Sequence, residues 1–109
     1  MRAGRLKKLI TFERRTQPHG DFGGQPEKWE AVATRVPSAI LPVRGEEKEQ
    51  NSRIESRVTH KIVTRWAESL GKVTPADRIK FGDRVFEITT AINLGERNRW
   101  LDFMCVEEV

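Results

Sequence analysis

The chain of 109 residues is long enough for one domain and too short for two separate hydrophobic cores. Charged residues make up 33% of it and hydrophobic residues 37%, so the core must be small or be completed by neighbouring subunits. No apolar run reaches the ~18 residues that cross a bilayer, and the first residues do not resemble a signal peptide. The single cysteine, Cys105, excludes an internal disulfide and favours synthesis in a reducing cytoplasm.

The net charge of +4 is concentrated at the start of the chain. The first eight residues hold four basic side chains and no acid, so basic and acidic residues balance over the rest. We therefore expect a basic N-terminal arm, residues 1–8, ahead of one domain, residues 9–109. Such an arm contacts phosphates or an acidic protein surface, or it serves only to keep the protein soluble. The sequence does not decide between these roles. The basic residues are Arg2, Arg5, Lys7 and Lys8.

The first half of the domain predicts two strands. Leu9–Thr16 alternates, with Ile10 and Phe12 on one face, which is typical of a half-buried strand. A glycine-rich segment precedes the second strand, Trp29–Val36. Pro37 lacks the N–H that a sheet requires, so it indicates an edge, bend or bulge before the chain resumes. In the second strand, Trp29, Ala31 and Ala33 are expected to share one face.

A long polar segment separates this part from the next strand. Arg44–Ser52 has no apolar residue, so we expect it to lie outside the core, as a loop or one turn of helix. The following segment, Arg53–Trp66, gives the clearest alternation, with His60, Ile62 and Thr64 on the inner face.

The last third of the chain predicts a hairpin and a closing strand. Arg78–Phe81 and Arg84–Ile92 are joined by the two residues Gly82 and Asp83, which suit a tight turn. Four residues of the second hairpin strand are expected to share one face, the inner one: Phe86, Ile88, Thr90 and Ile92.

The closing strand, Asn98–Val106, carries apolar groups on both faces, so we expect cover from the core and from a partner subunit. The inner set is Leu101, Phe103 and Cys105; the outer set, a candidate subunit interface, is Trp100, Met104 and Val106. Six to seven antiparallel strands predict an all-β fold, a small barrel or sandwich with one long polar loop and at most a short helix.

The sequence offers no clustered reactive groups. His19 and His60 are far apart and lack the cysteine or HExxH context of a zinc site, so His60 is interpreted as a partly buried strand histidine. Cys105 is interpreted as a core thiol. Glu46, Glu47 and Glu49 lie in a segment too polar to shift their pKa values. We therefore expect no enzyme, no metal and no cofactor.

The three tryptophans leave two functions open. Trp29, Trp66 and Trp100 lie beside Lys28, Arg65 and Arg99, as in barrels that stack single-stranded nucleic acid. Tryptophans in a small barrel more commonly anchor a core or an interface, which we favour. An OB-type nucleic-acid-binding barrel is the alternative function.

The order of several short motifs over nearly the whole chain resembles the phage head–tail adaptor family, also described as head–tail joining or head-completion proteins. Each motif is weak alone, and the specificity lies in their order and spacing. The motifs are Leu6 and Ile10 after a basic start, Asp21-Phe22-Gly23-Gly24, Trp29 with Val32-Ala33-Thr34, Ala39-Ile40-Leu41-Pro42, Gly45 with Glu47, Val58-Thr59-His60 leading to Arg65-Trp66, Val73 to Ile79, Gly82 to Ile88, and Leu101 to Cys105.

The resemblance implies a non-enzymatic structural virion protein: a ring, usually of about twelve copies of itself, in the neck between capsid portal and tail. The implied partners are a portal or portal-adaptor ring, a tail or tail-completion protein, and double-stranded DNA passing without sequence specificity, with no membrane. Synthesis is implied in the bacterial host cytoplasm. The loop after the second strand is implied to reach the channel and help retain DNA; it comprises Arg44, Gly45, Glu46, Glu47, Lys48, Glu49, Gln50, Asn51 and Ser52. The sequence departs from the family's pattern in two places. Lys48 stands where an aromatic residue is expected, and the connection from Trp66 to Thr74 is longer than expected.

Overall fold

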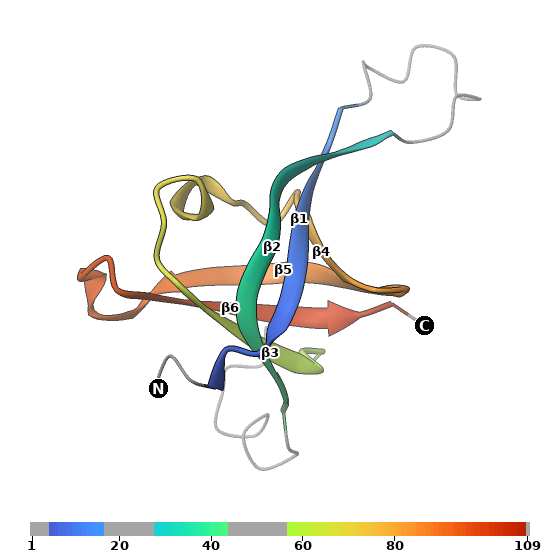
Figure 1. Ribbon diagram of the computed structural model, residues 1–109. Coiled ribbons are helices and arrows are strands. Elements are labelled where there is room, and N and C mark those ends of the chain that lie inside the picture. The colour runs from blue at the N-terminus through green and yellow to red at the C-terminus, as the bar shows by residue number, and fades with distance from the viewer. Residues whose placement is uncertain (1–4, 17–27, 44–56, 109) are drawn as a thin grey trace.

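The computed structural model describes residues 5–16, 28–43 and 57–108. Within them, six antiparallel strands close into a barrel in the order β1-β2-β3-β6-β5-β4 (Figure 1). The all-β barrel predicted from the sequence is confirmed. No helix of the described part is long and apolar enough to span a bilayer. The strands are β1 (Lys8–Arg15), β2 (Trp29–Pro42), β3 (His60–Arg65), β4 (Arg78–Phe81), β5 (Arg84–Asn93) and β6 (Trp100–Glu107), with two short 3-10 helices, η3 (Leu70–Lys72) and η4 (Leu94–Glu96).

The barrel interior is filled by large apolar side chains from five of the strands and from η3. Phe12 of β1 and Phe103 of β6 meet at its centre, with ring centroids 5.0 Å apart and both side chains fully buried. Strands alternate between inner and outer faces, so every second residue can join this cluster. The buried cluster comprises Ile10, Phe12, Ile62, Leu70, Val73, Ile79, Phe86, Ile88, Leu101, Phe103 and Cys105.

β2 is one long, bent strand where the sequence indicated an interruption. It continues through Pro37, which lies opposite Leu9, and the register with β1 shifts twice before that point. The shifts bring Ala33 opposite the core residue Phe12 and leave Ala31 exposed. The expected shared face of Trp29, Ala31 and Ala33 is therefore wrong, because bulges interrupt the alternation.

β3 is shorter than predicted within the described residues. It starts at His60, after a turn at Arg57, while residues 53–56 lie outside the described part. Its inner face is as expected, since Ile62 and Thr64 are fully buried.

The β4–β5 hairpin turns at Gly82 and Asp83 as predicted. Gly82 has φ 61°, a left-handed conformation that glycine adopts without steric cost. A bulge at Thr89 then shifts the register of β5 against β6. Thr90 and Ile92 consequently face outward, and Ile92 is 39% exposed, so the expected inner face of β5 is wrong in its second half.

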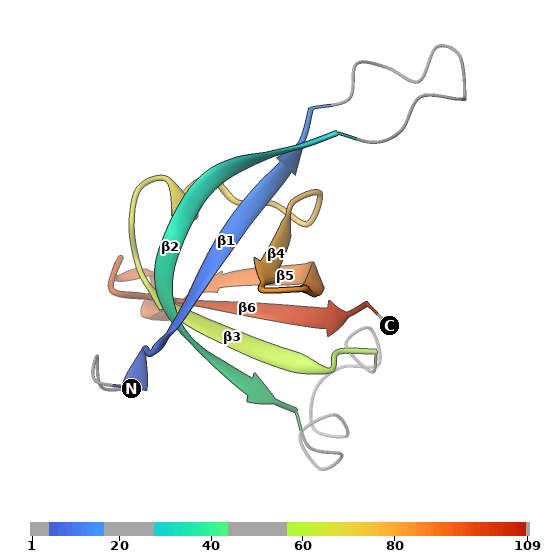
Figure 2. The same cartoon turned by 45° about the vertical axis from the view of Figure 1, so that its right-hand side comes forward.

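β6 lies between β3 and β5 in the barrel (Figure 2). Leu101, Phe103 and Cys105 face the core, as predicted. Trp100, Met104 and Val106 lie on the opposite face; Met104 is only 8% exposed although it is not part of the core cluster. Met104 is thus covered within the chain itself, and cover of this face by a partner subunit stays a prediction.

Candidate functional site

The predicted site residues fall into three groups, only one of which is fully described. The polar loop, Arg44–Ser52, lies outside the described residues, between the end of β2 and the start of β3. In the basic arm, Arg2 also lies outside them, whereas Arg5 and Lys7 are exposed. Lys8 is already the first residue of β1, with its Nζ 5.3 Å from the centroid of the Phe81 ring.

The outer face of β6 forms a second apolar layer, distinct from the core. Val63 of β3 lies between Ala39 of β2 and Asp102 of β6, and both Val63 and Ala39 are less than 8% exposed. At one end of this face, the Arg65 guanidinium lies 5.3 Å from the Trp100 ring centroid. The β3 residues opposite Met104 and Trp100 are Lys61 and Arg65, so charged groups lie beside the expected interface residues of β6.

Asp102 is a polar group within this apolar layer that the sequence analysis did not identify. Its Oδ1 atom is buried and has no hydrogen-bond partner among the residues that the structure describes. Burial raises the pKa of Asp102 above its usual value, and Lys61 opposes that rise. The signal was present in the sequence, because Asp102 is the one acid in an otherwise apolar run from Trp100 to Val106.

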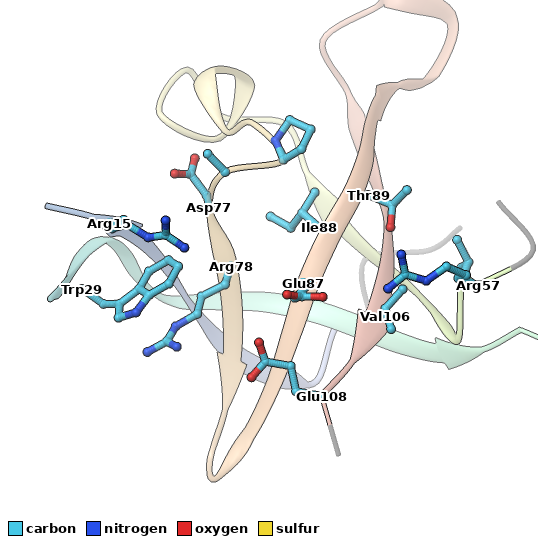
Figure 3. A pocket seen from close by; sticks show the side chains of 13 residues that line it. Arg15, Trp29, Arg57, Asp77, Arg78, Glu87, Ile88, Thr89, Val106 and Glu108 are labelled. Atoms are coloured by element: carbon cyan, nitrogen blue, oxygen red, sulfur yellow. The ribbon is translucent and has the colours of Figure 1, made fainter. Parts of the chain in front are cut away.

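A pocket of about 640 Å³ lies over the outer surface of β4, β5 and β6, beside Arg15 and Trp29 at the paired ends of β1 and β2 (Figure 3). Trp29 forms one wall, with the guanidinium carbon of Arg78 4.0 Å and that of Arg15 5.3 Å from the centroid of its ring. Arg78 Nε donates to Glu13 Oε1 at 2.7 Å, which fixes the arginine against the ring. The lining residues are Arg15, Trp29, Arg57, Val58, Pro75, Ala76, Asp77, Arg78, Glu87, Ile88, Thr89, Val106 and Glu108.

The charges of this pocket balance. Three arginines and three acids line it, and two of these groups, Arg78 and Asp77, are engaged by Glu13 and Arg14 of β1. Within the described ranges, no group of three histidine, cysteine, aspartate or glutamate side chains could hold a metal ion. Balanced charge beside an aromatic wall suits contact with another protein. Because Arg78 covers a face of Trp29, a nucleic-acid base would have to displace it to stack there.

His60 and Cys105 are held as the sequence predicted. His60 Nδ1 lies 2.9 Å from Thr59 Oγ1, and Nε2 lies 3.8 Å from Glu107 Oε1. Burial lowers the pKa of His60; the nearby Glu107 carboxylate opposes this effect, and Arg84 adds to it. Burial raises the pKa of the Cys105 thiol to about 12, so this sulfur is a core group.

Comparison with known proteins gives a family and several similar structures. The family model described as phage head completion protein matches residues 1–108. The solution structure of protein SF1141 from Shigella flexneri 2a has 25% sequence identity and a TM-score of 0.76, covering 100% of this chain and 98% of that chain. A chain in the virion of a native gene transfer agent particle has 24% identity and a TM-score of 0.66, covering 96% and 97%. The search of curated proteins found no match.

Proposed function

Because this chain belongs to the phage head completion protein family, we propose that it is a structural protein of the virion neck, a ring subunit that joins the portal to the tail. The observation that carries the proposal is the extent of the family match, residues 1–108, which includes the barrel, the basic arm and the polar loop. The role requires binding surfaces and no catalytic step.

The outer face of β6 supports lateral contact between copies. Its apolar residues lie outside the core cluster, and Ile92 of the neighbouring strand β5 is exposed on the same face. In a ring, one face of a subunit meets a different face of the next, and such contacts close on themselves. We assign Trp100, Met104 and Val106 to this contact.

The polar loop supports a role at the channel. Arg44–Ser52 contains three acids and two bases, so it would meet DNA with weak net repulsion and without gripping phosphates. Strong phosphate contacts would hinder DNA that has to be retained and later released. We propose that this loop lines the channel and helps to retain packaged DNA.

The basic arm supports docking. Arg2, Arg5, Lys7 and Lys8 concentrate positive charge at one end of a chain that is otherwise balanced. An acidic surface on an adjoining ring would attract it. We propose that the arm docks the subunit onto the portal-side or tail-side partner.

A joining assay tests this function. DNA-filled heads assembled without this chain are mixed with purified protein and tails, and infectious or tailed particles are counted. We expect the wild-type protein to restore joining and the fourfold alanine variant of the arm to restore less. Equal joining with and without the protein would refute the proposed function, whereas equal joining by wild type and arm variant would refute only the arm's role.

A further inference from the structure

One edge of β2 has no neighbouring strand over its first half in the part of the chain that the structure describes. Residues 29–37 pair with β1 alone, because β3 pairs with β2 only from Ser38 to Pro42. β3 ends at Arg65, and the chain continues into η3 without pairing again with β2. Figure 2 shows this half of β2 rising with β1 beyond β3. Such an edge offers backbone N–H and C=O groups to another extended chain.

A groove of about 400 Å³ runs beside this edge. β2 forms one wall, and the connection from β3 to η3 forms the other. Several of its apolar side chains, such as Val36 and Trp66, also pack against the core, which fixes their positions. The groove is lined by Leu6, Val32, Ala33, Thr34, Arg35, Val36, Pro37, Arg65, Trp66, Ala67, Ser69 and Leu70.

The charged side chains that line the groove are positive. Among the described residues that line the groove, Arg35 and Arg65 are charged and exposed, and none is an acid. Within the described ranges, neither guanidinium forms an ion pair with a carboxylate. A positive groove with apolar walls is complementary to an extended segment that alternates apolar and acidic side chains.

Arg35 is also conformationally unusual. It has φ 53°, a left-handed conformation uncommon for a residue with a side chain, at the bulge between the pairs Ile10–Val36 and Phe12–Ala33. Strained positions of this kind concentrate where a side chain is directed toward a function. The bulge breaks the alternation of β2 and presents Arg35 at the groove.

We propose that the free edge of β2 binds an extended acidic–apolar peptide of a partner protein, which adds a strand to the sheet and pairs a carboxylate with Arg35. The chain's own basic arm contributes Leu6 to the lining, but its positive charge does not complement Arg35 and Arg65. The polar loop, Arg44–Ser52, has no apolar residue to fill the groove. The peptide chemistry follows from the groove alone, whereas placing the partner in the virion neck rests on the proposed function.

A peptide titration tests the proposal on the isolated full chain. The probe is an octapeptide that alternates glutamate with valine, and the comparison probe alternates lysine with valine. Amide chemical shifts and amide hydrogen exchange are measured during each titration. We expect shifts and slowed exchange in residues 29–37 with the glutamate peptide, and about fivefold weaker binding of the lysine peptide at low salt. Absence of binding, equal affinity for both peptides, or shifts centred elsewhere would overturn the proposal.

A charge reversal tests the assigned side chain. Arg35→Glu is expected to lower the affinity for the glutamate peptide about fivefold and to raise the affinity for the lysine peptide. Lys80→Glu, on β4, makes the same charge change away from the groove and should leave both affinities unchanged. Thermal unfolding verifies that both variants fold. Unchanged binding by Arg35→Glu, or concentration-dependent self-association of the wild type that the peptide blocks, would exclude a peptide partner. No ring is needed here, so a failed joining assay would leave these results intact.

Discussion

The Arg14 guanidinium on β1 holds the Asp77 carboxylate, at the start of β4, through two hydrogen bonds of 3.1 and 3.2 Å. Asp77 is almost completely buried, with 1% of its side chain exposed, while Arg14 is 46% exposed. The backbone N–H of Thr74 donates a third hydrogen bond to the same carboxylate at 3.0 Å. This contact attaches the long β3–β4 connection to β1 and forms part of the pocket wall.

Replacing Asp77 should therefore destabilise the barrel. In Asp77→Ala, Arg14 and the N–H of Thr74 lose their acceptor, and we expect the free energy of unfolding to fall by about 2 kcal/mol. Urea unfolding measures the change. Glu68→Ala removes an exposed acid of the same connection and should change the free energy by less than about 0.5 kcal/mol. Similar effects of the two substitutions would contradict the structural role of the ion pair.

The stability of the protein should fall as the pH drops below neutrality, partly through His60. Burial lowers the pKa of His60 in the folded state below its unfolded value of 6.5, so unfolded chains bind more protons between these two values. The contribution of His60 to the free energy of unfolding is therefore fully present above pH 6.5. It declines as the pH falls through that value toward the folded pKa of His60. His60→Gln should flatten this part of a stability–pH curve. A slope that persists in His60→Gln would assign the effect to other groups.

Glu107 should add to acid sensitivity at lower pH. Its hydrogen bonds to Arg84, of 2.8 and 2.9 Å, lower the pKa of Glu107 below the usual 4.5. The resulting stabilisation is present above pH 4.5 and is lost as the pH falls through the folded pKa. Glu107→Gln should reduce the pH dependence in this range, measured by thermal unfolding at a series of pH values. An unchanged curve would show that the ion pair adds no stability.

The Cys105 thiol should be unreactive in the folded protein. With its pKa raised to about 12, only about one thiol in 10⁴ is ionised at pH 8, and the sulfur is also inaccessible. A thiol–disulfide exchange reagent should therefore modify it only after the protein is unfolded in urea. Rapid modification of the folded protein would contradict the burial of β6.

The outer face of β6 should be required for ring assembly more than for folding. Trp100→Ala and Val106→Ala remove half-buried side chains, and we expect each to weaken subunit association by tenfold or more, about 1.4 kcal/mol, while the barrel remains folded. Leu9→Ala truncates an exposed leucine on β1, which does not adjoin β6, and serves as the control. Sedimentation in the presence of the portal measures association. Wild-type assembly by both β6 variants would reject this face as the interface.

Much of the fold followed from the sequence because strands leave a two-residue alternation wherever one face is buried. The inner sets of β3 and β6, and the Gly82–Asp83 turn, were all predicted correctly on this basis. The bulges were not, because neither Arg35 nor Thr89 is a glycine and an inserted residue has no local signature. The bulge at Thr89 reverses the faces that follow it, which accounts for the error at Ile92. The separate register shift between Ala31 and Ala33 accounts for the error at Ala31.

The candidate sites were harder to predict from the sequence than the strands were. The Trp29 pocket depends on Arg78 from a distant strand, and the groove beside β2 exists because β3 ends at Arg65. Such relationships are set by register and strand length, which composition does not determine. The assignments of the arm, Arg44–Ser52 and the outer face of β6 remain proposals from the sequence and the family.

The measurement that tests the central claim most directly is electron microscopy of this protein mixed with its portal complex. We predict a ring of barrels stacked coaxially on the portal, with the outer face of β6 at the contact between neighbours. A portal without added density, or a single copy bound off the axis, would contradict a ring subunit of the virion neck.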